Sequence, residues 1–421
     1  GFVLYFIAIG IITLASYLSR PAKTSSYNEF MLGNRSVNYV LTALSAHASD
    51  MSDWLFMAFP AMLYAHGAIS FWIAFGLIAG MWITWSYIAP QLRKATQNYN
   101  AITLSSYFEQ RFDDRLGFLR IVSALLCCLF FTVYIAAGFK AFGYLSESLF
   151  EIPALYGTGI AVICALLYVT LGGYAALAWI DAFQALFLLS VIFLVPYKSF
   201  YMIGGTQAII EAAHNQHISL SLIPNSLLDA INTILLAISW GVGYFGMPHI
   251  LTKFMGITDL SNIKKSQYIG VAWQTAVLGA AGSVGLLAIA YFPETLPNKE
   301  LAFIYMVKDM FTPLVTGVIL SSVAGATLAV ITAQILVIVS VITEDLYRKS
   351  WNPTATETQL VWISRSTIFV TTIIGALLSL NNTVNIQQLV HYAWMGFGAS
   401  FGPLVLISLN STRITNYGRS E

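Results

Sequence analysis

Long apolar stretches separated by short polar segments run along nearly the whole chain. An α-helix of about 20 apolar residues crosses the roughly 30 Å hydrocarbon core of a bilayer. By this criterion the sequence predicts eleven spans, at residues 2–18, 39–66, 70–90, 118–146, 153–171, 178–202, 226–252, 268–292, 312–343, 357–381 and 386–409. We therefore expect an all-α membrane protein with about 11 transmembrane helices.

Composition agrees with a lipid environment and excludes several functions. Hydrophobic residues make up 57% of the 421 residues and charged ones 9%, against roughly 25% charged in soluble domains. The net charge of +1 and the lack of a basic run argue against a nucleic-acid partner. No nucleophile elbow, phosphate-binding loop or metalloprotease motif occurs in the polar segments, so we do not expect an enzyme.

The basic residues predict an orientation in the bilayer. Fifteen lysines and arginines fall in one set of alternate loops and three in the other. Since cytoplasmic loops carry the excess of basic residues, we expect the N-terminus outside and the C-terminus in the cytoplasm. The expected location is the inner (plasma) membrane of the cell, as a multi-pass protein in the lipid bilayer.

A polar run interrupts the second predicted span. The segment SAHASDMSDW at positions 45 to 54 places Asp50 and Asp53 inside an apolar stretch. An aspartate near the bilayer centre costs roughly 2.5 to 3.5 kcal/mol on insertion scales. These carboxylates therefore need a cation, a proton or a water-filled cavity, and the run predicts a functional site.

The span at 226–252 carries a second interruption. It reads SWGVGYFGMPHIL from position 239 to 251, and Pro248 removes a backbone donor while the glycines favour departure from helical geometry. A simple kink is one interpretation of this segment. Two broken helices, each beginning a set of five, instead indicate a secondary transporter built from inverted repeats.

Four motifs carry a resemblance to a known family. SAHASDMSDW, the GYFGMPHIL run at 243 to 251, ITEDLY at 342 to 347 and YAWMGFGASFGP at 392 to 403 resemble the sodium/solute symporter family, in particular its bacterial sodium/proline symporter branch. The resemblance implies the leucine-transporter-type fold of 5+5 helices in a single transmembrane domain, 1–421. Residues 2–18 would form one extra helix, 39–202 the first repeat and 226–409 the second. Members of this branch usually carry two further C-terminal helices, and from the resemblance we expect these to be missing from residues 1–421.

The resemblance also implies a substrate and an ion. Expected is import of a small amino acid, L-proline, coupled to Na⁺ by alternating access. Aromatic walls and a few polar groups suit a zwitterion with an apolar ring. The implied substrate-binding residues are Tyr134, Trp240, Tyr244, Pro248, Ser52 and Trp54. Carbonyls of Ala48, Met51 and Ala326 would bind Na⁺, with Ser45 and Asp50 important for ion coupling and Asp181 for ion exit.

This chain departs from the family at the sodium site. Where the family has a serine–threonine pair, the sequence has Ala329 and Val330. A small hard cation prefers several oxygen ligands, so losing two hydroxyls should weaken sodium binding. Thr332, three residues beyond Ala329 and thus roughly on the same face, is a candidate for partial compensation.

Further departures add titratable groups and leave alternative functions open. His47 and Asp53 stand where the branch has glycine, and Met247 replaces a family glutamine. One alternative is a proton-coupled amino acid transporter in which H⁺ on Asp53 or His47 replaces sodium. Another is a transporter-like membrane sensor. Retention of coupling by Na⁺ in the absence of a pH gradient would exclude the proton alternative.

Overall fold

The computed structural model describes residues 7, 10, 11, 35–381 and 383–411, and most of the predicted span 2–18 lies outside them. The described residues are helical and include no β-strand. The helices are α3 (Tyr39–Ala48), α4 (Phe59–His66), α5 (Phe71–Ile83), α6 (Ala89–Asn98), α7 (Leu104–Arg111), α8 (Phe118–Phe150), α9 (Ala154–Ile192), α10 (Leu194–Met202), α11 (Thr206–Asn215), α12 (Leu227–Gly246), α13 (Pro248–Met255), α14 (Ile263–Tyr291), α15 (Ala302–Met310), α16 (Pro313–Ser340), α17 (Glu357–Ser379) and α18 (Ile386–Asn410).

Most predicted spans coincide with helices. Among the described residues, eight helices are long and apolar enough to cross a membrane. The largest difference concerns the predicted spans 153–171 and 178–202, because α9 runs without a break from Ala154 to Ile192. The intervening residues 171–177 contain no proline and no charge, so nothing in them requires the helix to end.

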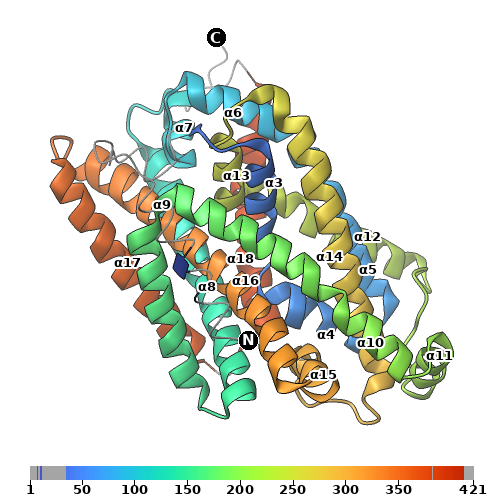
Figure 1. The fold of residues 1–421 in the computed structure, drawn as a ribbon. Helices are drawn as coiled ribbons and strands as arrows, with labels where there is room; N and C mark the ends of the chain where they lie inside the picture. Colours follow the sequence, from blue (N-terminus) through green and yellow to red (C-terminus); the bar gives the residue numbers. More distant parts are fainter. Residues whose placement is uncertain (1–6, 8–9, 12–34, 382, 412–421) are drawn as a thin grey trace.

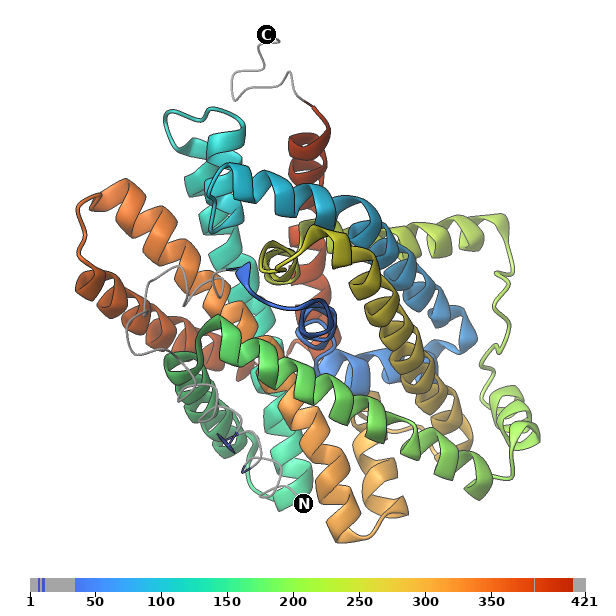
Figure 2. The same cartoon turned by 45° about the horizontal axis from the view of Figure 1, so that its top comes forward.

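The continuous helix α9 nevertheless changes direction. At about 1.5 Å per residue, a straight helix of its 39 residues would be nearly twice as long as a bilayer core is thick. Figures 1 and 2 show instead that α9 turns near its middle, and that its second arm leads directly into α10. One hydrogen-bonded helix thus provides two arms with different directions.

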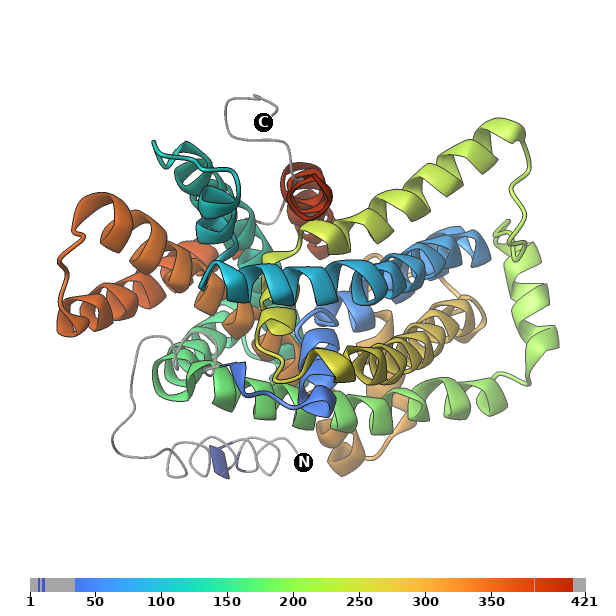
Figure 3. The same cartoon turned by 90° about the horizontal axis from the view of Figure 1, so that it is seen from above.

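Two short helices occupy the centre of the molecule. In Figures 1 and 2, α3 and α13 lie among the longer helices α9, α14, α16 and α18, and α3 packs against α9, α13 and α14. Helices α6 and α7 lie at one end of the bundle, whereas α10, α11 and α15 lie at the other (Figure 1). Seen from above, α13 lies beside the central helix α3 (Figure 3).

Close packing between α5 and α12 fixes one side of this centre. A Cβ atom on Gly76 would lie 2.0 Å from the carbonyl oxygen of Ala237, and one on Gly80 would lie 2.2 Å from that of Gly241. Small residues four apart let membrane helices approach to backbone contact. The glycines therefore hold α12, which contributes side chains to the site, directly against α5.

The outer surface is apolar, as a lipid-facing surface requires. Large apolar side chains project outward from α8, α9, α12 and α17 at Leu125, Leu129, Ile163, Leu167, Ile234 and Phe369. Buried polar residues concentrate instead around the α3 break, where His47, Ser49, Ser52 and Asp53 are each 1% exposed or less. This distribution is inverted relative to a water-soluble protein and is that of a multi-pass membrane protein.

Candidate substrate and ion site

Helix α3 ends at Ala48, and the chain resumes as a π-helical turn at Trp54–Ala58 that leads into α4. In a regular helix the Ser52 N–H would bond to the Ala48 carbonyl, but it bonds to Asp50 O at 3.1 Å. Likewise the Leu55 N–H bonds to Ser52 O at 3.0 Å rather than to Met51 O. The carbonyl oxygens of Ala48 and Met51 therefore lack the N–H donors that a regular helix would provide.

The second predicted interruption is confirmed between α12 and α13. Helix α12 ends at Gly246, Met247 is extended with φ −80° and ψ 103°, and Pro248 opens α13. Because proline has no N–H, it cannot bond to the Tyr244 carbonyl four residues earlier. The ends of two half-helices therefore meet at this level, with α13 packed beside α3.

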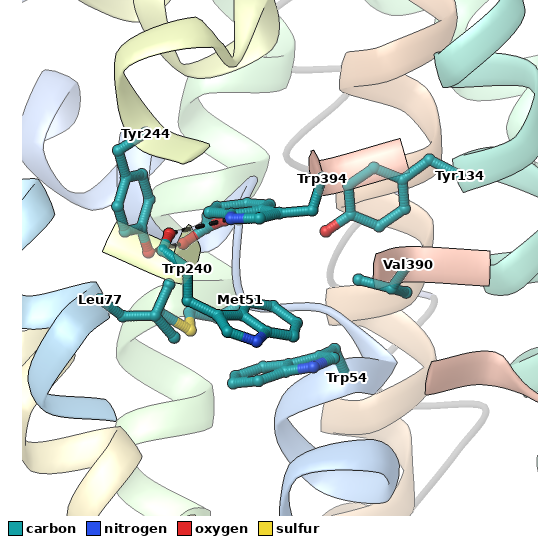
Figure 4. A pocket seen from close by; sticks show the side chains of 9 residues that line it. Met51, Trp54, Leu77, Tyr134, Trp240, Tyr244, Val390 and Trp394 are labelled. Atoms are coloured by element: carbon teal, nitrogen blue, oxygen red, sulfur yellow. Dashed lines mark hydrogen bonds between the residues drawn. The ribbon is translucent and has the colours of Figure 1, made fainter. Parts of the chain in front are cut away.

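A pocket lies between the two breaks, as Figure 4 shows. Its cavity volume is only about 10 Å³, which is the scale of a single water molecule. Its walls come from the α3 break, α5, α8, α12 and α18. The lining residues are Asp50, Met51, Trp54, Leu77, Tyr134, Trp240, Tyr244, Val390 and Trp394.

Aromatic rings form most of the pocket wall. The Trp54 and Trp240 ring centroids lie 5.2 Å apart, and Tyr244 meets Trp394 edge-to-face at 5.0 Å. The Trp394 indole N–H donates to the Trp240 backbone carbonyl at 2.9 Å, which fixes the Trp394 ring. Trp54 Nε1 is buried and has no hydrogen-bond partner. The wall therefore offers ring faces and one unused donor.

A layer of aromatic rings closes the pocket toward the α6–α7 end. Phe131 lies on α8 one turn from Tyr134 and contacts Phe397 with centroids 4.4 Å apart. Phe401 continues this layer at 5.8 Å from Phe397. Phe131 and Phe397 are each 0% exposed, and Phe401 is 1% exposed. These three buried rings from α8 and α18 form the aromatic floor of the candidate site.

The α16 face of the break is apolar where the family has hydroxyls. Ala326, Ala329 and Val330 are each 2% exposed, and α16 packs against α3 and α13. The hydroxyl of Thr332, the candidate for compensation, donates to the Ala329 carbonyl of its own helix at 3.0 Å. Its role in binding an ion stays a prediction.

Asp181 forms a buried ion pair close to the break. Its Oδ2 accepts from the Lys253 ammonium at 2.8 Å and from the Ser45 hydroxyl at 2.7 Å. The three residues come from α9, α13 and α3, so the contact joins three elements that surround the site. Asp181 Oδ1 is buried and has no partner. The structure thus places two of the predicted ion-coupling residues together and adds a lysine that the sequence did not single out.

His47 and Asp53, the two added titratable groups, point to different surroundings. His47 Nε2 accepts from the Trp85 indole at 3.2 Å, and its ring also lies beside Trp273. Asp53 is 1% exposed, and its Oδ2 has no partner. The structure brings neither residue into the pocket lining.

Six residues predicted from the sequence line the pocket together. They are Asp50, Met51, Trp54, Tyr134, Trp240 and Tyr244. Ser52 and Pro248 shape the two breaks without lining it. Leu77, Val390 and Trp394 were not expected from the sequence; in the structure Gly243 makes room for Trp394, since a Cβ there would lie 1.9 Å from Trp394 Nε1.

Comparison with known proteins decides the family. The model of the sodium:solute symporter family matches residues 30–419. The chain belongs to the sodium:solute symporter family. This is a family of transporters, which agrees with the eight helices of the described residues that could cross a membrane.

Curated relatives in this symporter family cover nearly the whole chain. The sodium/proline symporter of Salmonella typhimurium is 37% identical over 405 residues, which are 94% of this chain and 80% of the relative. The osmoregulated proline transporter OpuE of Bacillus subtilis is 36% identical over 99% of this chain and 84% of its own. The Escherichia coli sodium/proline symporter is 36% identical over 94% and 80%.

Solved structures show the same fold at lower identity. A Na⁺-coupled sialic acid symporter in a substrate-bound, outward-open state superposes with a TM-score of 0.79 at 15% identity and covers 98% of this chain and 86% of its own. MhsT in complex with L-phenylalanine gives 0.66 at 14% identity over 88% and 89%. At these identities the likeness concerns the fold alone.

Proposed function

We propose that this symporter imports L-proline together with Na⁺ by alternating access. The observation that carries the proposal is the aromatic pocket with one carboxylate, Asp50, between two helix breaks. Ring faces suit the pyrrolidine ring of proline, and a zwitterion needs few fixed polar groups beside them. Relatives at 36 to 37% identity are named for proline, which supports the same substrate.

The helix order supports the two-repeat architecture and orientation. The first repeat would comprise α3 with α4, α5 with α6, α8 and the two arms of α9 with α10; the second would comprise α12 with α13, α14, α16, α17 and α18. Each set starts with a broken helix. With the predicted helix 2–18 the total is eleven, in a single domain. The basic loops then put the α6–α7 end in the cytoplasm and the N-terminus outside, in the inner membrane.

Sodium would bind at the carbonyls that the α3 break releases. The carbonyl oxygens of Ala48 and Met51 have no regular helical N–H partner. The Ala326 carbonyl would add a third oxygen from α16. Since Ala329 and Val330 supply no hydroxyl, we expect weak sodium affinity. The Asp181–Ser45 contact lies beside the break and provides the next oxygens for an ion leaving toward the cytoplasm.

Transport requires the aromatic floor and the wall formed by Trp54, Trp240 and Trp394 to open in turn. With room for about one water, the pocket must widen to admit proline, and Trp54, Trp240 and Trp394 have to separate. Rocking of the elements with the two breaks against α8, α16 and α18 would open one side while the other stays closed. The aromatic floor is the barrier on the cytoplasmic side.

The decisive experiment is proline uptake into proteoliposomes with the Na⁺ and pH gradients imposed separately. An inward Na⁺ gradient should drive accumulation at equal pH on both sides. Radiolabelled proline measures uptake, and empty liposomes provide the control. No accumulation under either gradient would refute the proposed function.

One observation favours proton coupling as a second candidate. Asp53 is buried and carries an oxygen without a partner, and it makes no ion pair among the described residues. Its turn packs against the Lys299–Leu301 turn, which holds the acidic Glu300. A proton would stabilise a carboxyl in this setting. Uptake driven by a pH gradient without Na⁺, and lost in Asp53→Asn, would establish this coupling.

A further inference from the structure

A chain of hydrogen bonds connects α14 to the pocket carboxylate. The Gln274 side-chain amide on α14 donates to the Tyr244 hydroxyl at 2.9 Å. Tyr244 on α12 in turn donates to Asp50 Oδ2. Gln274 and Tyr244 are each 0% exposed, and Asp50 is 5% exposed. Of these three hydrogen-bonded residues, the sequence pointed to Asp50 and Tyr244 but not to Gln274.

The direction of donation along these two hydrogen bonds is fixed. The amide nitrogen can only donate, so the tyrosine oxygen must accept from it. Tyr244 is then left with its single proton for the carboxylate. Asp50 Oδ2 is therefore held as a hydrogen-bond acceptor, which fixes the orientation of the carboxyl group in the pocket.

Asp50 lacks a positively charged partner. It forms no ion pair among the described residues, and the pocket lining contains no lysine, arginine or histidine. A buried carboxylate without a cation is costly, even when it accepts one hydrogen bond. The positive charge has to come from whatever occupies the pocket.

The Asp50 carboxylate is directed toward α12 and away from α16, although Met51, an expected sodium ligand, lines the same pocket. The carboxylate bonds to α12 and lines a pocket formed with residues of α5, α8, α12 and α18. None of the lining residues comes from α16, which carries Ala326, Ala329 and Val330. The carboxylate thus faces the substrate side of the break.

We infer that Asp50 is the counter-ion of the substrate's ammonium group and that Gln274 and Tyr244 are positioning residues that hold it. This inference rests on the proposed function and assigns the amine end of the substrate. The ring faces of Trp54, Trp240 and Trp394 around the carboxylate suit an ammonium by cation–π attraction. The site takes zwitterions with a secondary or N-alkylated ammonium on an apolar ring.

The other end of the zwitterion has a matching donor. Trp54 Nε1 is buried, lines the pocket and has no partner. An indole N–H can only donate, so it pairs with a substrate carboxylate. Asp50 and Trp54 then bind the two charges from the two sides of the α3 break.

The test compares L-proline with (S)-tetrahydrofuran-2-carboxylate, which carries a ring oxygen in place of the ammonium. Binding is measured by competition with labelled proline at saturating Na⁺, on the full chain in nanodiscs. The wild type should prefer proline by about 100-fold, as sites built for a charged partner discriminate strongly. Asp50→Asn should weaken proline by a similar factor, leave the analogue nearly unchanged and so remove the discrimination.

Positioning by Gln274 has its own readout. Gln274→Met should weaken proline by about 10-fold, because a lost hydrogen bond to a charged network costs on this order. The effect should vanish in a Tyr244→Phe background, since the relay is already broken there. The matched control is Gln267→Met on the same helix, where the amide bonds to the Trp82 carbonyl and Ser86 outside the pocket. This control should bind proline as the wild type does.

The outcomes separate the inference from the proposed function. If the wild type binds proline and Asp50→Asn keeps the discrimination while only its Na⁺ requirement rises, Asp50 serves the ion and the inference is wrong. If Asp50→Asn does not fold, Tyr244→Phe decides: with Asp50 no longer held in place the discrimination should fall, and an unreduced discrimination again overturns the inference. If the wild type binds neither proline nor any other amino acid, the proposed function fails and the inference fails with it.

Discussion

The two faces of the α3 break differ sharply in chemistry. On one face, α12, α8 and α18 supply four aromatic rings around Asp50, and the break residue Trp54 supplies a fifth. On the other face, α16 offers Ala326, Ala329 and Val330, none of which has a side-chain oxygen. One interruption of one helix would therefore serve both the proposed substrate pocket and the proposed ion site. The two can vary separately because they use opposite sides of the same backbone.

The largest effect on proline uptake should come from a substitution that fills space on the aromatic face of the break. In Gly243→Val the new side chain would occupy the space of the Trp394 indole, since even a Cβ would lie 1.9 Å from its Nε1. Overpacking of this kind displaces the ring, and we expect roughly 100-fold slower proline uptake or its complete loss. Uptake into proteoliposomes measures this.

The matched control is Gly279→Val on α14, where a Cβ meets nothing within 4 Å. This variant should transport as the wild type does, and both should give the same elution profile on size exclusion. Normal uptake by Gly243→Val would mean that Trp394 is not part of the wall during transport.

On the ion side, removing the buried ammonium should destabilise the protein. Lys253→Met leaves Asp181 buried without its cation, which typically costs about 3 to 5 kcal/mol. The double variant Asp181→Asn, Lys253→Met should recover most of this loss. Thermal melting in detergent checks the order, with the exposed Lys264→Met as control. A double variant as unstable as the single one would argue against the pair as the cause.

Restoring the two hydroxyls on the α16 face should strengthen sodium binding and leave proline binding unchanged. Ala329→Ser with Val330→Thr should raise the apparent Na⁺ affinity by about 10-fold, because oxygen ligands are what a small hard cation prefers. Proline affinity at saturating Na⁺ should stay unchanged. Sodium titration of proline binding measures both. An equal gain in the two affinities would show that the faces are not separate.

The smallest effect should follow Thr332→Val. The hydroxyl donates to the Ala329 carbonyl of its own helix, so we expect the Na⁺ affinity to change by no more than about 2-fold. The same titration measures it. A loss near 10-fold would show that Thr332 compensates for the missing pair.

The sequence predicted those features that have local causes. Pro248 and the glycines before it, and the polar run around Asp50, each disturb helical hydrogen bonding within a few residues, and the structure has its breaks there. The single helix α9 was not predicted, because two apolar spans with a change of direction between them look the same whether or not the helix ends.

Side-chain partners across helices could not be read in the same way. Helix α18 carries Tyr392, Trp394, Phe397 and Phe401, and apolar residues all round a helix do not tell which ring faces the pocket. Gln274 gave no signal either, since its partner Tyr244 is 30 residues away. The family resemblance supplied Tyr134, Trp240 and Tyr244, whereas contacts peculiar to this chain required the structure.

The aromatic floor of Phe131, Phe397 and Phe401 has an electrical consequence. Each unit charge that crosses 100 mV releases about 2.3 kcal/mol, and a continuous file of water through the pocket would dissipate that energy as a leak current. Packed rings between the pocket and the α6–α7 end would interrupt such a file. On the proposed mechanism the floor therefore insulates the membrane, and the gradient discharges only when a transport cycle moves the rings apart.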